Sequence, residues 1–261
     1  MRTYLVNLER RRDRLAAMQR QLDSLGIPFT HFPATDANKL EPACIKEAFP
    51  PGPLGQLSRG DIACTLSHVR LLDTFLRSKD EVAVVLEDDI VLSPDAARWI
   101  CHDDWLPSDF SVIKLERFGP QNQKLVVGKG WSLGEGRELA PLLSKHGGSA
   151  AYIIARKAAE RFLETASDRL SLPIDHLLFN PNNSNLALEL RPLQFLPALG
   201  QQQEEVGGIS EIRKWRKGEQ PKGLSYLSRE AVRAWYEVRR VPQQLASIVS
   251  GYGHLRQIEF R

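Results

Sequence analysis

Residues 82–89 read Val-Ala-Val-Val-Leu-Glu-Asp-Asp, a run of apolar residues that ends in three consecutive carboxylates. The apolar part is typical of a strand buried on both faces, as in a parallel sheet that is covered by helices. In such sheets, ligands bind beyond the carboxyl ends of the strands. Because side chains alternate along a strand, extended geometry would place Glu87 and Asp89 on one face and Asp88 on the other.

Three adjacent carboxylates repel one another unless a cation or a proton neutralises them. Their oxygen atoms suit a hard divalent ion such as Mn²⁺ or Mg²⁺, and a metal with open coordination positions can also bind a diphosphate. The residues therefore predict a metal site at the end of this strand, formed by Glu87 and Asp89. The alternative is a solvated junction between a strand and a loop.

The composition is that of a globular domain, with 261 residues of which 42% are hydrophobic and 26% are charged. The chain is long enough to bury a large core. It contains no run of about 18 apolar residues that would span a membrane, and the apolar stretch at its start is too short for a signal peptide. Cys44, Cys64 and Cys101 lack the spacing of zinc ligands and indicate a reducing compartment, so we expect a cytoplasmic protein.

The net charge of +3 conceals a basic C-terminal segment. Residues 211–261 carry eleven Lys or Arg and five Asp or Glu, whereas the rest holds 24 basic and 27 acidic residues. This segment predicts an anionic partner, namely a membrane surface, a phosphorylated glycolipid or a nucleic acid; a solvated helical face is the alternative. A predicted helix over 227–240 contains Trp235 and Tyr236, which suit a membrane surface but also ordinary packing.

The pattern of apolar residues predicts an α/β domain over residues 1–205 and a basic, partly helical extension over 206–261. Strand 3–8, helix 9–25 and strand 29–34 form a β-α-β unit, which implies a parallel pair of strands. Residues 40–57 are a long connection rich in Pro and Gly, and 206–223 is read as a mobile segment or linker. The remaining predicted elements are helix 58–78, strands 82–88 and 110–115, a short strand at 125–127, strand 149–155, helix 156–166, a short helix from 173, and strands 186–190 and 193–196.

Polar residues close several of these strands. Asn7 and Arg10 follow the first strand and Asp36 follows the second, at positions where a ribose or a base often binds in α/β folds. A helix cap would equally explain Asn7, and a turn would equally explain Asp36. Glu116 ends strand 110–115, and Asp175 stands at a helix start, where an acidic cap is the structural alternative.

Ser67 and His68 lie on helix 58–78, with His68 at the edge of its buried stripe, where a structural histidine is the simpler reading. The sequence contains no nucleophile elbow, P-loop or G-x-G-x-x-G fingerprint, which disfavours the corresponding hydrolases, kinases and NAD enzymes.

A series of short motifs runs along the chain: Tyr4-Leu-Val-Asn-Leu-Glu-Arg-Arg-Arg-Asp-Arg14, Pro33-Ala-Thr-Asp36, Leu57-Ser-Arg-Gly-Asp-Ile-Ala-Cys-Thr-Leu-Ser-His68, Val85-Leu-Glu-Asp-Asp89, Val112-Ile-Lys-Leu115, Gly148-Ser-Ala-Ala-Tyr-Ile-Ile154 with Ala158-Ala159, and Pro173-Ile-Asp175. Taken in order, these motifs resemble glycosyltransferase family 25, the lipopolysaccharide-type galactosyltransferases, over roughly residues 3–200. The family usually has Gly in place of Ala63, and residues 117–146 are particular to this chain, so the acceptor stays open.

The resemblance implies a nucleotide-diphospho-sugar transferase fold of the GT-A type, with a mostly parallel sheet flanked by helices. It implies a UDP-sugar donor, most often UDP-galactose, and an inverting transfer to a lipopolysaccharide-type or lipooligosaccharide-type glycan. By that analogy Asn7, Arg10 and Asp36 hold the uridine, while Ser67 and His68 line the donor site.

The same analogy implies a Mn²⁺ (or Mg²⁺) ion on Asp89, together with Glu87 or Asp88, which also face the donor. An inverting displacement needs a base for the acceptor hydroxyl, for which Asp175 is the first candidate and Glu116 the second. The expected partners are the donor and a glycolipid or oligosaccharide acceptor, with peripheral contact to the inner membrane face through the basic segment. No nucleic acid is expected.

Two other functions are alternatives. A metal-dependent phosphoesterase would use the acids for catalysis and the basic tail for nucleic acid. A catalytically silent sugar-nucleotide-binding module would need the cleft without the carboxylates at 87–89 and 175.

Overall fold

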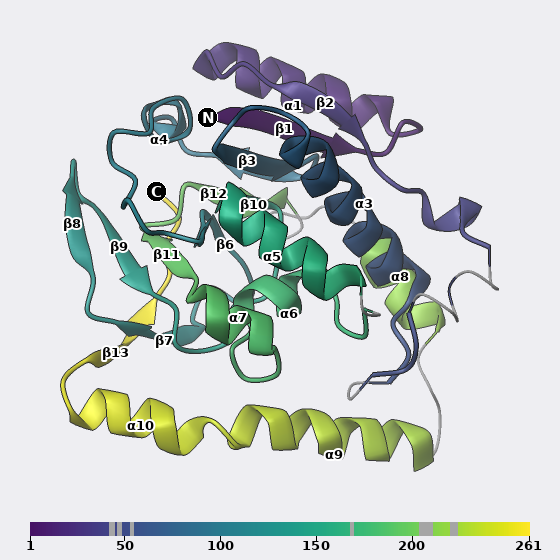
Figure 1. Ribbon diagram of the computed structural model, residues 1–261, viewed down its shortest axis with the longest axis vertical. Coiled ribbons are helices and arrows are strands. Elements are labelled where there is room, and N and C mark those ends of the chain that lie inside the picture. The colour runs from purple at the N-terminus through teal and green to yellow at the C-terminus, as the bar shows by residue number, and fades with distance from the viewer. Residues whose placement is uncertain (42–44, 46–48, 53–54, 168–169, 204–210, 220–223) are drawn as a thin grey trace.

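The computed structural model describes residues 1–41, 45, 49–52, 55–167, 170–203, 211–219 and 224–261 (Figure 1). Its centre is an eight-stranded sheet in the order β2-β1-β3-β10-β5-β11-β9-β8. Six of these strands point in the same direction, and β10 and β9 run against them. The strands are β1 (Arg2–Asn7), β2 (Thr30–Pro33), β3 (Val82–Glu87), β5 (Val112–Lys114), β8 (Trp131–Gly134), β9 (Arg137–Pro141), β10 (Ala151–Ala155) and β11 (Leu193–Leu196).

Helices cover both faces of the sheet, which confirms the predicted α/β class. On one face the core is formed with α3 (Arg59–Leu76), α5 (Arg156–Ser167), α6 (Ile174–Phe179) and α7 (Asn185–Leu190), and on the other with α1 (Arg12–Leu25) and α4 (Ala96–Ile100). Successive residues of β3 alternate between these two cores. Its apolar run is therefore buried on both faces, as the sequence predicts.

The predicted strand over 186–190 is wrong, because these residues form helix α7. The Ser184 hydroxyl accepts a hydrogen bond from the Ala187 N–H at 3.0 Å and so caps the helix. Leu186, Ala187 and Leu190 are buried, a spacing that puts them on one helical face as readily as on a strand. The other elements predicted up to residue 196 form at their expected places, several of them one to three residues shorter.

Two smaller sheets complete the fold. One contains β4 (Ile90–Leu92), β12 (Gly200–Gln202) and β6 (Glu116–Arg117), and the other pairs β7 (Lys124–Gly128) with β13 (Gly253–Gln257). A single 3₁₀ turn, η1 (Ala37–Lys39), follows β2. The chain end thus returns to the sheet layer, although the predicted division at residue 205 stays a prediction.

The C-terminal residues form α8 (Glu211–Gly218), α9 (Leu224–Val238) and α10 (Val241–Val249). The linker predicted over 206–223 is wrong for the residues of α8, and its remainder lies largely outside the described residues. Helix α9 overlaps the helix predicted over 227–240, whereas α10 was not predicted. Helix α8 packs beside α3, and α9 and α10 run end to end along one edge of the molecule (Figure 1). Over the described residues, no helix combines the length and the apolar character needed to cross a bilayer.

Candidate active site

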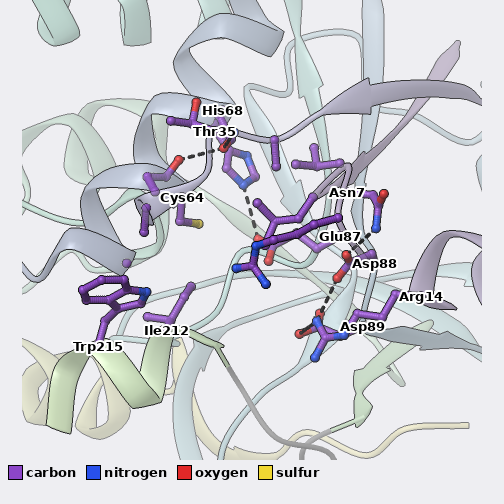
Figure 2. Close-up of a pocket in the computed structure, with 18 residues that line it drawn as sticks. Asn7, Arg14, Thr35, Cys64, His68, Glu87, Asp88, Asp89, Ile212 and Trp215 are labelled. Carbon is purple, nitrogen blue, oxygen red and sulfur yellow. Dashed lines mark hydrogen bonds and ion pairs between the residues drawn. The ribbon is translucent and has the colours of Figure 1, made fainter. Parts of the chain in front are cut away.

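A cleft opens at the carboxyl ends of β1, β2 and β3, where parallel strands of α/β folds usually bind ligands. Its central cavity measures about 680 Å³, including the solvent at its mouth. Residues from α3 and α8 form the wall opposite the strand ends (Figure 2). The predicted site residues that line this cavity are Asn7, Arg10, Ser67, His68, Glu87, Asp88 and Asp89.

The three carboxylates at the end of β3 separate into two groups. The strand ends at Glu87, and the next two residues turn into β4, so the alternation of side chains does not continue past it. The Glu87 carboxylate accepts a hydrogen bond from the Ser149 hydroxyl at 2.9 Å and lies 3.2 Å from His68 Nε2. Asp88 and Asp89 turn instead toward Arg14, at 2.9 and 3.6 Å (Figure 2).

Asp89 is the carboxylate whose negative charge is least compensated. Burial, followed by the charges of Glu87 and Asp88, raises the pKa of Asp89 well above its usual value, and Arg14 offsets this only in part. Its Oδ1 atom is buried and has no hydrogen-bond partner among the residues that the structure describes. Asp88, by contrast, accepts hydrogen bonds from the Asn7 amide at 2.6 Å and from Arg14. An unpaired carboxylate oxygen at the cleft fits a divalent ion, which in nucleotide sites takes one or two carboxylates together with phosphate oxygens.

A second group of possible metal ligands lies nearby. Ligand atoms of Cys64, His68 and Glu87 lie within 4.8 Å of one another. A thiol and an imidazole beside a carboxylate are ligands that zinc prefers over manganese. Asp89 does not belong to this group, so the cleft offers two different environments for a cation.

Helix α3 places His68 and Ser67 in the cleft. The Ser58 hydroxyl caps the helix by accepting the Asp61 N–H. His68 is fully buried rather than at the edge of the core, and its Nδ1 lies 2.8 Å from the Tyr152 hydroxyl. The histidine thus connects the core to Glu87. The Ser67 hydroxyl accepts the Thr35 N–H at 2.9 Å, which fixes the backbone after β2 against α3.

Arg10 and Asp36 extend the cleft away from the carboxylates. Arg10 Nε donates to Asp36 at 2.8 Å, and Asp36 also accepts the Asn38 N–H as the cap of η1. Burial would raise the pKa of Asp36, but these hydrogen bonds hold it below its usual value. A cavity of about 870 Å³ lined by Arg10, Asp36 and Lys39 shares Arg10 and Thr35 with the central one.

Asp175 lies at the other end of the cleft from Arg10 and Asp36, beyond Glu87. It stands in the first turn of α6, where one of its oxygens accepts the Gly148 N–H at 3.2 Å and the other accepts the His176 N–H at 2.9 Å. Burial would raise the pKa of Asp175, but the charges of His176 and Arg216 and the Gly148 hydrogen bond hold it below its usual value. The cavity at Asp175 shares Glu87 with the central cavity. Asp175 is therefore an ionised carboxylate on the same cleft.

Glu116 has different surroundings. It is fully buried, and its carboxylate accepts hydrogen bonds from Lys114 Nζ and from the Ala150 N–H, each at 2.8 Å. Burial raises the pKa of Glu116 to about 6, although Lys114 lowers it. Lys114 also donates to the Gly148 carbonyl. The Lys114–Glu116 pair thus fixes the backbone at Gly148 and Ala150, next to Asp175. Glu116 lines none of these three cavities.

Sequence reasoning missed several residues of the cleft. Arg14, Cys64 and Tyr152 stand inside the quoted motifs, but nothing in their spacing assigns them a contact. Trp215 of α8 lines the central cavity and Arg216 lines the one at Asp175. They come from a segment in which no motif was recognised.

A polar cleft at the strand ends of an α/β sheet is the usual ligand site of enzymes of this class. Comparison with known proteins defines the class further. Residues 1–178 match the model of glycosyltransferase family 25 (LPS biosynthesis protein). The chain therefore belongs to glycosyltransferase family 25, which confirms the resemblance of its motifs and identifies it as a glycosyltransferase.

Two relatives are similar over comparable lengths. The lipooligosaccharide biosynthesis protein lic2B of Haemophilus influenzae is 27% identical over 191 residues, which cover 70% of this chain and 71% of the relative. The lacto-N-neotetraose biosynthesis glycosyltransferase LgtB of Neisseria gonorrhoeae is 30% identical over 194 residues, covering 70% and 68%. Among solved structures, a glycosyltransferase involved in glycosylation of the major capsid of PBCV-1 aligns with a TM-score of 0.45 and 9% identity, covering 84% of this chain and 98% of that one.

Proposed function

We propose that this enzyme transfers a hexose, galactose in the first instance, from a UDP-sugar to a lipopolysaccharide-type or lipooligosaccharide-type glycan. The observation that carries the proposal is one cleft that runs from Asp36 past Asp89 to Asp175. Such a cleft has room for a nucleotide, a diphosphate and a sugar in sequence. The names of the two relatives support the glycan class, and the family supports a GT-A type of fold and a sugar-nucleotide donor.

The uridine end of the donor would lie at the carboxyl ends of β1 and β2. Arg10 and Asp36 form a hydrogen-bonded ion pair there. The Asp36 carboxylate can still accept hydrogen bonds from ribose hydroxyls. Asn7 holds Asp88, so it orients the acidic turn as well as facing the cavity. Ser67 and His68 close the donor pocket from the side of α3.

A Mn²⁺ or Mg²⁺ ion would be held by Asp89, whose Oδ1 is unpartnered, with Glu87 as the neighbouring carboxylate. When bound, the ion supplies Lewis-acid stabilisation of the charge that develops on the departing UDP. Arg14 would orient this acidic turn, because its guanidinium contacts both Asp88 and Asp89.

Asp175 is the proposed base of an inverting displacement. The acceptor hydroxyl oxygen bonds to the anomeric carbon, the bond from that carbon to the UDP oxygen breaks, and the hydroxyl proton passes to the Asp175 carboxylate. A lowered pKa keeps this carboxylate ionised, and its place on the cleft rather than its basicity supports the role. Of the two carboxylates considered, Asp175 is favoured over Glu116 because it lines the cleft.

The C-terminal helices are proposed to hold the enzyme on the inner face of a membrane. Among the described residues, nine large hydrophobic side chains are exposed, and all except Trp131 lie between residues 232 and 255. Arg233 and Arg239 adjoin two of them, Val232 and Val238, in the sequence. Exposed apolar side chains with adjacent arginines are typical of helices that rest on anionic lipid. The eight side chains are Val232, Trp235, Val238, Val241, Leu245, Val249, Tyr252 and Leu255.

The function is tested by incubating the protein with a panel of UDP-sugars and Mn²⁺, with and without truncated lipooligosaccharide. We expect one UDP-hexose to be consumed faster in the presence of the glycan, with the sugar recovered on it in the inverted configuration. Hydrolysis of phosphodiesters without any sugar transfer would instead support a phosphoesterase. Binding of UDP without turnover would support a silent binding module.

A further inference from the structure

A further cavity lies beyond Asp175, on the side away from the donor pocket. It measures about 1070 Å³, including the solvent at its mouth. It shares Asp61, Asp175 and Arg216 with the cavity at Asp175 described above, which in turn adjoins the central cavity at Glu87. Its outer wall comes from α9, whose Arg229 and Arg233 line it. The carboxylate proposed as the base therefore stands at the junction between the donor side and this cavity.

Most of the cations that line this cavity already have acidic partners. Arg216 contacts Asp61 at 2.6 Å. Arg233 contacts Glu230 at 3.1 Å. Lys145 contacts Glu237, also at 3.1 Å. The first pair joins α8 to α3, the second lies within α9, and the third joins α9 to the body of the protein. Together they leave little net charge for a ligand.

Arg229 differs from the other cations. Its Nε atom is buried and makes no hydrogen bond, and no ion pair of Arg229 occurs within the part of the chain that the structure describes. A buried guanidinium donor without a partner is unfavourable, and native structures normally satisfy such groups with protein, water or ligand. A phosphate or a carboxylate is the ligand group whose geometry matches a guanidinium.

We propose that this cavity is the acceptor subsite and that Arg229 binds one anionic group of the acceptor glycan, a phosphate monoester or a sugar carboxylate. The inference rests on the proposed function, because it takes Asp175 as the base that faces the acceptor hydroxyl. Arg229 lies outside residues 1–178, which match the family model. Recognition of the acceptor would thus come from a segment outside the part of the chain that the family model matches.

The test uses delipidated lipooligosaccharide core in three forms: untreated, dephosphorylated with hydrofluoric acid, and carboxyl-reduced. The KM for each acceptor is measured at saturating UDP-sugar for wild type, Arg229→Gln and Arg240→Gln. Arg240 is a matched control, because it follows α9 in the chain but does not line the cavity. Hydrolysis of the donor without acceptor is measured in parallel, and it reports whether the donor side is intact.

We expect Arg229→Gln to raise the KM for untreated core by about tenfold to a hundredfold, the loss of one charged hydrogen bond. The same variant should match wild type on the one treated form that has lost the recognised anion, which identifies that anion as phosphate or carboxylate. Donor hydrolysis and the Arg240→Gln variant should be unchanged. An Arg229→Gln effect that is absent, or equal on all three forms, overturns the inference while transfer persists. Absence of any turnover by wild type overturns the proposed function, and the inference with it.

Discussion

The end of β3 and the C-terminal helices differ in which kind of side chain they bury and which they expose. At the end of β3, polar groups are buried and bonded to one another, as in the contacts of Asp88 with Asn7 and Arg14. Along α9 and α10 the reverse holds, because apolar side chains such as Trp235 and Val249 are 65% and 87% exposed. The first arrangement fixes the geometry of its polar groups, whereas the second leaves apolar side chains exposed.

The sharpest way to break this contrast is Asp89→Asn. If Asp89 carries the metal, its loss removes several kcal/mol of transition-state stabilisation, so kcat should fall by about 10³- to 10⁴-fold. Calorimetry should also show that Mn²⁺ no longer promotes UDP binding. Asp13→Asn is the control, since Asp13 is an exposed acid paired with Arg11. Unchanged metal-dependent UDP binding in Asp89→Asn would contradict the assignment.

Asp175→Asn tests the side of the cleft that faces the acceptor. Removing a general base should lower kcat by about 10²- to 10³-fold, with UDP affinity close to that of wild type because Asp175 lies away from the uridine end. Steady-state kinetics and UDP calorimetry measure the two effects separately. Retention of kcat in this variant, together with its loss in Glu116→Gln, would transfer the role of base to Glu116.

The buried carboxyl group of Glu116 should make the stability of the fold depend on pH. The folded protein holds the pKa of Glu116 at about 6, above the ordinary value of 4.5. A raised acid pKa means that the folded state binds the proton more tightly, so this stabilisation is present at low pH and is lost between pH 4.5 and 6. As the pH rises across that window, the free energy of unfolding of wild type should fall by about 2 kcal/mol relative to that of Glu116→Gln. Urea unfolding across this range measures it, and parallel curves would contradict the account.

Trp235→Ser should have the smallest effect of these substitutions, and it should change only the binding of the protein to lipid. Loss of one large apolar side chain should weaken binding to vesicles of anionic lipid about tenfold, without changing kcat on a delipidated acceptor. Trp131→Ser is a matched control, because Trp131 is also exposed but belongs to β8. Equal vesicle binding by both variants and wild type would remove the membrane proposal. A vesicle sedimentation assay decides between these outcomes.

The sequence predicts the elements around the end of β3 well because their signals are local. The apolar run before Glu87 and the β-α-β opening are each set by neighbouring residues, and the structure confirms them. The contacts of His68 with Tyr152 and Glu87 join residues far apart in the chain. No spacing rule supplies such a contact, so His68 was assigned to the edge of the core although it is fully buried.

The C-terminal half was harder to predict for a physical reason. Helix α8 is short and lies in a Gly-rich, basic stretch, where Ile212 and Trp215 pack against Gly60 of α3 and Arg216 pairs with Asp61. Two apolar residues among eight are too few for a periodic pattern to stand out. The misassigned strand at 186–190 has the opposite cause, since a short apolar run fits a strand and a helix equally well.

Anomalous diffraction at the manganese edge, from crystals that contain UDP and Mn²⁺, locates the ion itself. The account predicts a single peak beside the Asp89 carboxylate, bridged to the UDP diphosphate, with the uridine directed toward Asp36. A peak at Cys64, His68 and Glu87 instead, or UDP bound with Asp89 facing solvent, would contradict it.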